Sequence, residues 1–255
     1  MFAQIEITTI CNYRCFYCAG RDMPQEHMTW ECFEGVIARL PEGRFSVSLQ
    51  GEGEPMAHRD FWRMVERVQA AGKIPYTITN GSLIRDSRRL AAAFPSIGVS
   101  VDTLDPAEAE RIGRLRLRNV LRNLERLAAC MAPERIVVHT VDYGQPLGPL
   151  RDWLGERGFR SHVVQAIQQK PDYNYRYPAL VKLHRPSDYT YACRRIDRRD
   201  MRYYDLHGVE MPCCFIKDVR QFVSTDHIAG ELASRRVPPC CTGCREIIAP
   251  QHGQR

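Results

Sequence analysis

Cysteine is the residue that most constrains this chain, because eleven cysteines gather mainly toward its two ends. Three lie close together near the N-terminus, six lie in the last quarter of the chain, and two lie between these groups. They are Cys11, Cys15, Cys18, Cys32, Cys130, Cys193, Cys213, Cys214, Cys240, Cys241 and Cys244. An odd number of cysteines, with no secretory signal expected at the N-terminus, argues against a disulfide framework. The distribution predicts two metal sites, one toward each end.

Between these groups, short runs rich in branched residues alternate with segments of helical periodicity. The strand candidates are residues 2–8, 45–49, 76–79, 97–101, 136–141 and 161–166. Apolar residues at helical spacing occur at Phe61, Val65 and Val68, and again at Leu117, Leu121, Leu124 and Ala128. Such alternation predicts an α/β fold with a parallel sheet covered by helices, either barrel-like or doubly wound. Six strands are fewer than the eight of a closed barrel.

The first cysteine group has the spacing C-x3-C-x2-C and directly follows the first strand candidate. Three thiolates on one loop can bind three corners of an iron–sulfur cube and leave the fourth iron open for another ligand. A structural zinc ion requires four protein ligands, and the spacing of His27 from Cys18 gives no support for a fourth. Loops at the carboxyl ends of parallel strands are also where α/β folds bind their ligands.

The triplet Cys11, Cys15 and Cys18, with the aromatic Tyr17 before its last cysteine, resembles that of the radical S-adenosylmethionine (radical SAM) enzymes. The resemblance implies a partial (β/α)6 barrel and a [4Fe-4S] cluster whose open iron is chelated by S-adenosylmethionine. It further implies reductive cleavage of that cofactor to a 5′-deoxyadenosyl radical, which abstracts hydrogen from a substrate.

Three further motifs follow successive strand candidates in the order found in this family. They are Gly51-Glu52-Gly53-Glu54-Pro55, Thr79-Asn80-Gly81 and Ser100-Val101-Asp102. The resemblance implies that Gly51, Gly53, Glu54, Thr79, Asn80, Ser100 and Asp102 bind the cofactor, together with Tyr17. Glu54 would meet its amino group, and Ser100 would lie near its ribose and methionine moiety. Glu52 stands where the family more often has glycine, so its role is open. Among several nearby arginines, Arg114 is our choice for the cofactor carboxylate.

The second cysteine group flanks an expected hairpin with its turn at His207-Gly208 and ends in a C-x2-C pair. Four thiolates of this kind could bind zinc or an iron–sulfur cluster, and their spacing does not distinguish the two. The segment resembles a shortened SPASM/twitch extension of radical SAM enzymes, which implies one auxiliary [4Fe-4S] cluster. We expect Cys193, Cys213, Cys241 and Cys244 to be its ligands, with Cys214 and Cys240 spare. Cys32 and Cys130 are expected to be buried core residues.

The expected organisation is a core barrel over residues 1–167, a proline- and tyrosine-rich connector over 168–192, and a cysteine-rich twitch-like module over 193–255. The formal charge of +6 is a modest basic excess and argues against a nucleic-acid partner. No run of apolar residues is long enough for a membrane span, so we expect a cytoplasmic protein.

The expected activity is radical SAM chemistry on a small polar metabolite, leading to oxidation by dehydrogenation or to rearrangement, in a biosynthetic setting such as natural-product formation. An electron donor such as flavodoxin or ferredoxin would supply the reducing electron. Two alternatives stay open: radical modification or epimerisation of a peptide or protein residue, and a non-catalytic metal-binding scaffold.

Overall fold

The predicted alternation of strands and helices is present in the computed structural model, which describes residues 1–174 and 178–249. The chain forms two compact units. The first contains Met1–Ile167 together with Tyr204–Gly208, and the second contains Gln168–Tyr203 and the described residues from Val209 onward.

The first unit is built on parallel strands in two neighbouring sets, with the orders β3-β2-β1 and β4-β5-β6-β7. Their bounds are β1 Phe2–Ile5, β2 Ser46–Leu49, β3 Ile74–Tyr76, β4 Ile78–Thr79, β5 Ile97–Ser100, β6 Ile136–Asp142 and β7 Ser161–Ala166. Each predicted strand is present, and the third differs because it is divided into β3 and β4. The resulting α/β fold with parallel sheets is consistent with the partial barrel implied by the resemblance.

Thr77 explains the division of the third strand. Its side chain is fully buried and its hydroxyl donates a hydrogen bond of 2.7 Å to the carbonyl of Leu49. Its own carbonyl accepts a hydrogen bond of 2.8 Å from the amide of Gly98, next to the following pair of strands. Thr77 therefore contacts both sets of strands while the regular ladder is interrupted at its position.

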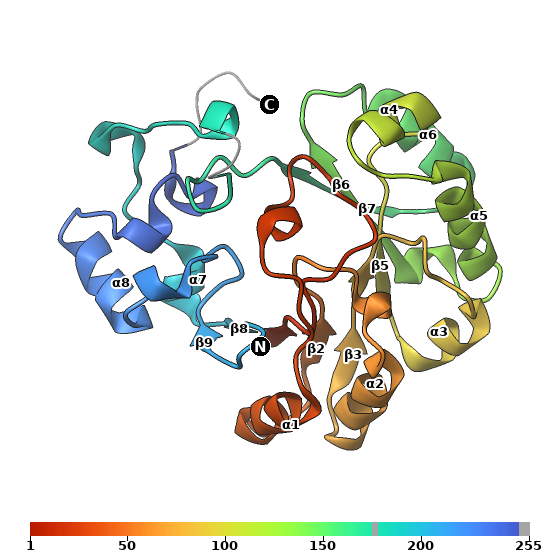
Figure 1. Ribbon diagram of the computed structural model, residues 1–255, viewed down its shortest axis with the longest axis horizontal. Coiled ribbons are helices and arrows are strands. Elements are labelled where there is room, and N and C mark those ends of the chain that lie inside the picture. Colours follow the sequence, from red (N-terminus) through yellow and green to blue (C-terminus); the bar gives the residue numbers. More distant parts are fainter. Residues whose placement is uncertain (175–177, 250–255) are drawn as a thin grey trace. The chain divides into compact units, whose positions relative to one another are not determined.

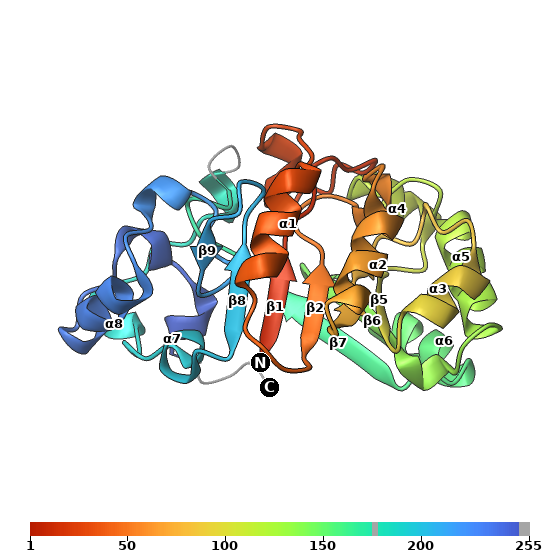
Figure 2. The same cartoon turned by 90° about the horizontal axis from the view of Figure 1, so that it is seen from below.

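Helices cover one face of these strands, as Figures 1 and 2 show for α1 and α2 over β1 and β2 and for α3, α5 and α6 farther along. Their bounds are α1 Trp30–Arg39, α2 Phe61–Ala70, α3 Ser87–Ala93, α4 Pro106–Arg111, α5 Leu117–Ala128 and α6 Gly148–Glu156. Side-chain oxygens of Thr29, Asp86 and Asp105 cap α1, α3 and α4 by accepting backbone N–H groups.

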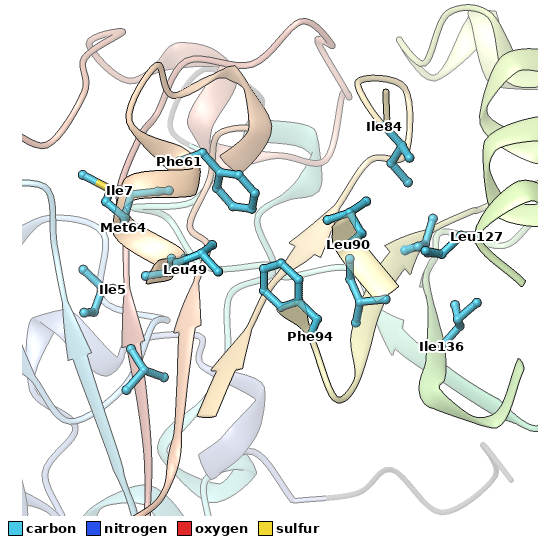
Figure 3. Close-up of a cluster of buried hydrophobic side chains, with 14 of the residues drawn as sticks. Ile5, Ile7, Leu49, Phe61, Met64, Ile84, Leu90, Phe94, Leu127 and Ile136 are labelled. Carbon is cyan, nitrogen blue, oxygen red and sulfur yellow. The ribbon is translucent and has the colours of Figure 1, made fainter. Parts of the chain in front are cut away.

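The core of the first unit lies between the strands and these helices (Figure 3). Strand residues such as Ile5 and Leu49 are fully buried there, and the Phe61 and Phe94 rings stack with centroids 6.2 Å apart. Since side chains alternate along a strand, the other face carries a different set. That face carries polar residues in both sets of strands: Gln4, Ser48 and Tyr76 are in register across β1, β2 and β3, and Ser100 and His139 are in register across β5 and β6.

The second unit has little regular structure and a smaller core, which includes Ile196, Ile216, Ile228 and Ile247. Its helices are α7 Arg194–Arg198 and α8 Thr225–Ala233, and its short strands are β8 Met201–Tyr204, whose last residue belongs to the first unit, and β9 Glu210–Met211. β8 and β9 are hydrogen-bonded neighbours on either side of the turn at Gly208, which confirms the expected hairpin.

Short 3-10 helices complete both units. They are η1 Ala19–Asp22, η2 Pro55–Ala57, η3 Pro133–Arg135, η4 Pro178–Leu180, η5 Pro186–Asp188, η6 Val219–Gln221, η7 Pro239–Cys241 and η8 Arg245–Ile247. Across residues 1–174 and 178–249, no helix has both the length and the apolar character that a membrane crossing requires.

Candidate functional site

The loop that carries Cys11, Cys15 and Cys18 begins shortly after β1 and is fastened to the segment after α4. The amides of Arg14 and Phe16 donate to the carbonyls of Gly113 and Ile112, at 3.1 and 3.2 Å. The guanidinium of Arg21 donates to the carbonyl of Cys15 at 2.6 Å. These three hydrogen bonds between protein groups hold the backbone of the cysteine loop in place.

Gly113 is required by this packing and was missed by the sequence analysis. Its φ is +89°, and a Cβ atom there would lie 2.2 Å from the carbonyl oxygen of Arg14. Any larger residue would therefore push the cysteine loop away. A glycine one residue before Arg114 carried no motif that distinguished it from an ordinary turn residue.

The three thiols of the loop lie close enough to influence one another electrostatically. Burial raises the pKa of Cys11 to about 11, and the charge of Cys15 adds to this effect. Burial also raises the pKa of Cys18, with further contributions from Glu52 and Cys15. Because the thiols of Cys11 and Cys18 resist ionisation, a cation is needed to hold them as thiolates, and the donor set of the three cysteines fits an iron–sulfur cluster.

Among the described residues, no three His, Cys, Asp or Glu side chains converge tightly enough to hold a single metal ion. A cubane cluster makes a different demand, because each thiolate binds its own iron at a separate corner. The spread of the three cysteines around one loop therefore suits an iron–sulfur cluster better than a single metal ion.

Glu54 is the central carboxylate of the site and is 2% exposed. It accepts hydrogen bonds of 2.7 Å from the Thr79 hydroxyl and from the Asn80 amide. Burial raises the pKa of Glu54, and these hydrogen bonds act against that rise. The Asn80 side-chain amide in turn lies 3.8 Å from the sulfur of Cys11. The structure therefore brings Glu54, Thr79, Asn80 and Cys11 together from three separate strand ends, as expected.

Gly51 and Gly53 allow the loop after β2 to lie directly against the end of β1. A Cβ atom on Gly51 would be 2.3 Å from the Glu6 side chain, and one on Gly53 would be 2.5 Å from the carbonyl of Thr8. Glu6 is buried and accepts a hydrogen bond of 2.8 Å from the amide of Glu52. Both glycines thus have a packing role that places Glu54. Glu52 itself accepts from the thiol of Cys18 at 3.4 Å.

Tyr17, Ser100, Asp102 and Arg114 form a second cluster around a buried ion pair. The Arg114 guanidinium lies 2.9 Å from the Asp102 carboxylate and donates to the Ser100 carbonyl at 2.8 Å. The Tyr17 hydroxyl donates to Asp102 and accepts from Arg114. Arg114 also lies close enough to Cys15 to interact with it electrostatically. Arg114 is therefore already engaged with its own chain, which the sequence could not indicate.

Tyr143 extends this cluster and was also missed. Its ring stacks on Tyr17 with centroids 6.0 Å apart, and its hydroxyl donates to Glu108 at 2.8 Å. A single tyrosine after a strand gives no signal in a sequence, because its partners Tyr17 and Glu108 come from two other segments.

The second cysteine group lies within the second unit. Burial raises the pKa of Cys213 to about 12, with smaller contributions from the charges of Cys214 and Cys244. Burial raises the pKa of Cys244, with a smaller contribution from the charge of Cys193. The hydrogen bond with Cys240 raises the pKa of Cys241, with smaller contributions from burial and from the charges of Cys244 and Cys213. The four expected ligands thus share one electrostatic neighbourhood. Cys240 is also close, with its sulfur 3.9 Å from that of Cys241.

The two isolated cysteines differ from the expectation that both are core residues. Cys130 is exposed, and Cys32 is only partly buried. Cys130 follows the C-terminal end of α5, where the amphipathic pattern no longer directs side chains inward, so the expectation for it was wrong. Cys32 lies in the first turn of α1, where its amide is capped by Thr29.

Several curated proteins are similar in sequence to parts of this chain. A nucleotide dehydratase dependent on S-adenosylmethionine from Selenomonas ruminantium is 28% identical over 144 residues, which are 54% of this chain and 52% of that protein. A probable GTP 3′,8-cyclase of Thermococcus kodakarensis is 32% identical over 179 residues, which are 65% of this chain and 55% of that protein. The chain thus spans about half the length of these curated relatives.

The crystal structure of Streptococcus suis SuiB bound to the precursor peptide SuiA matches with a TM-score of 0.64 and 15% identity, over 94% of this chain and 65% of SuiB. This likeness concerns the fold alone. Residues 5–154, which carry every residue of the first cysteine group and of the two clusters around Glu54 and Asp102, match the profile of the Radical SAM superfamily. The chain therefore belongs to the radical SAM superfamily.

Proposed function

We propose that this protein is a radical SAM enzyme that removes a hydrogen atom from a small polar metabolite and so brings about its oxidation or rearrangement. The observation that supports this most directly is the meeting of Cys11, Asn80, Thr79 and a fully buried Glu54 at one edge of the parallel strands. When bound together, a [4Fe-4S] cluster and S-adenosylmethionine supply reductive cleavage of the cofactor and the 5′-deoxyadenosyl radical that abstracts the hydrogen.

The chain's own residues would perform distinct tasks in binding this pair. Cys11, Cys15 and Cys18 would hold the cluster. Glu54 would accept a charge-assisted hydrogen bond from the cofactor ammonium, because its carboxylate is buried and already oriented by Thr79 and Asn80. Asp102, Ser100 and Tyr17 would border the cofactor on the other side.

In the same proposal, Arg114 supplies the positive charge of the site. Its ion pair with Asp102 and its hydrogen bond to Tyr17 hold it beside the cysteine loop, and the cofactor carboxylate would complete its coordination. Gly51 and Gly53 contribute by keeping the loop of Glu54 close to β1.

The second cysteine group would hold an auxiliary [4Fe-4S] cluster in a twitch-like module of residues 193–255, with Cys193, Cys213, Cys241 and Cys244 as its ligands. Such a cluster would accept the electron that a substrate radical loses on dehydrogenation. An electron donor such as flavodoxin or ferredoxin would reduce the first cluster. Protein reconstituted with iron and sulfide should then contain about eight irons per chain; zinc without iron would contradict the proposal.

The curated relatives are named for reactions of nucleotides, which supports a small molecule over a peptide as substrate. Anaerobic enzyme should form 5′-deoxyadenosine in a substrate-dependent manner with nucleotides or other small polar metabolites. Cys15→Ala should abolish this product, whereas Cys130→Ala, at an exposed position, should leave it unchanged. Product formed only with peptides, with deuterium taken up from solvent, would instead favour epimerisation.

The role of Glu54 can be tested by binding alone. Glu54→Gln keeps the shape of the side chain but removes the charge that would face the cofactor ammonium. We expect S-adenosylmethionine to bind about 10–100-fold more weakly, as for a lost charged hydrogen bond. Glu110→Gln, at an exposed position of α4, is the matched control for loss of a carboxylate. Equal affinities of both variants in calorimetry would remove Glu54 from the binding site.

A further inference from the structure

The second unit contains one fully buried lysine, and it lies among the cysteines. Lys170 is 0% exposed, although it is one of only four lysines in a chain rich in arginine. Burying an ammonium group costs several kcal/mol of desolvation free energy unless its hydrogen bonds are satisfied. The partners that satisfy it therefore indicate what the lysine holds together.

Those partners come from both cysteine-bearing segments. The Lys170 ammonium donates to the carbonyl of Phe215, which directly follows Cys213 and Cys214. It also donates to the carbonyl of Cys240 at 2.8 Å, immediately before Cys241. One side chain thus ties the Cys213 segment to the Cys241–Cys244 segment.

The third partner is a carboxylate. The Lys170 ammonium lies 3.2 Å from Asp172, whose same oxygen accepts the amide of Lys217 at 3.3 Å. A compact ammonium with three donors matches two carbonyls and a carboxylate around it, whereas a planar guanidinium has a different geometry. The arrangement therefore suits lysine specifically.

The charge of Lys170 reaches the sulfur atoms as well. Its ammonium is held against the carbonyls of Phe215 and Cys240, so the positive charge lies beside both cysteine-bearing segments. A positive charge that favours thiolates also favours any more negatively charged state of a group bound by them.

We propose that Lys170 is a positioning residue of the auxiliary site: it brings the Cys213 and Cys241–Cys244 segments together and raises the reduction potential of the cluster that they bind. The inference rests on the proposed function for the presence of that cluster. Asp172 acts in opposition, since its negative charge partly cancels that of the ammonium.

The test uses the full chain with Cys11, Cys15 and Cys18 all changed to alanine, so that only the second group can bind a cluster. After reconstitution with ferrous iron and sulfide, this parent protein should contain about four irons. Adding Lys170→Met should remove most of that iron, and what remains should have a more negative midpoint potential in an electron paramagnetic resonance titration. Lys182→Met, at an exposed lysine of the same unit, should change neither quantity.

A second variant covers the case in which Lys170→Met does not fold. Asp172→Asn keeps a hydrogen-bond acceptor beside Lys170 but removes the opposing charge, so the midpoint potential should become more positive. Full iron content with an unchanged potential in Lys170→Met would overturn the inference, as would an unchanged potential in Asp172→Asn. A parent protein without iron would reject the auxiliary cluster itself and the inference with it.

Discussion

At the scale of single residues, Asp102 makes more interactions than its position after a strand suggests. One of its oxygens accepts the backbone amide of Val141 at 2.8 Å, and the other contacts Arg114 and Tyr17. Burial raises the pKa of Tyr17 well above its ordinary value, and the charge of Asp102 adds to this effect. The tyrosine therefore remains a hydrogen-bond donor to the carboxylate at any pH at which the protein is studied.

The buried pair of Asp102 and Arg114 leads to a stability prediction. Arg114→Met would leave the Asp102 carboxylate buried without its cation, at a cost of about 3–5 kcal/mol in the free energy of unfolding. Arg111→Met breaks a more exposed pair with Glu108 and should lower the free energy of unfolding far less. Urea denaturation of the cluster-free protein measures both. Similar losses in the two variants would show that the Asp102 pair contributes no more than a surface pair.

At the scale of elements, the cysteine loop takes its conformation from the segment that follows α4. Because the loop has no regular structure of its own, its backbone hydrogen bonds go to Gly113 and Ile112. The segment after α4 thus determines the conformation of the loop after β1 that carries Cys11, Cys15 and Cys18.

Gly113→Ala should therefore disturb the cysteine loop, although Gly113 lies far from that loop in the sequence. The added Cβ would meet the Arg14 carbonyl at a positive φ, so the protein should lose about 1–3 kcal/mol of stability and bind less iron at the first cysteine group. Gly35→Ala, in the middle of α1 with no atom close to its Cβ, should instead be stabilising by about 0.5–1 kcal/mol. Iron analysis and thermal unfolding distinguish the two. Full iron content in Gly113→Ala would show that the loop adjusts without this contact.

The elements of the first unit could be predicted because their signals are local. The apolar spacing of α5 and the branched runs of five strands are properties of short segments, and the helical spacing of Leu117, Leu121, Leu124 and Ala128 lies within the observed helix. The division at Thr77 could not be predicted, because it depends on a hydrogen bond to Leu49 on another strand.

The same distinction holds for the candidate site. Cys11, Glu54 and Asn80 could be placed together because the carboxyl ends of parallel strands share one edge. The engagement of Arg114 by Asp102 and the burial of Lys170 depend on side chains that meet only after folding. Ion pairs of this kind leave no periodic pattern in a sequence.

At the scale of the whole molecule, the polar face of the strands makes stability depend on pH. Burial lowers the pKa of His139 to about 4, and its imidazole hydrogen-bonds the Tyr76 hydroxyl at 3.2 Å. An unfolded chain binds this proton below about pH 6.5, whereas the folded protein does so only near pH 4. The unfolded state therefore binds more protons between these values, and stability falls as the pH decreases through this window.

His139→Gln should reduce that dependence. Between about pH 7 and pH 5, the variant should lose about 1–2 kcal/mol less unfolding free energy than the parent protein. His227→Gln, at an exposed position of α8, should follow the parent. Urea unfolding of cluster-free protein at several pH values measures the slopes, and a His139→Gln slope equal to that of the parent would contradict the assignment.

The return of Tyr204–Gly208 to the first unit has a consequence for how the protein is made. The Tyr204 carbonyl accepts the amide of Glu6 at 2.9 Å, and the Gly208 carbonyl accepts the Arg39 guanidinium at 2.7 Å. During synthesis, these partners emerge only after the first stretch of the second unit, Gln168–Tyr203. The contacts of Glu6 and of helix α1 with Tyr204–Gly208 can therefore form only late in synthesis. The ribosome must translate well beyond the last strand of the first unit before that unit can be complete.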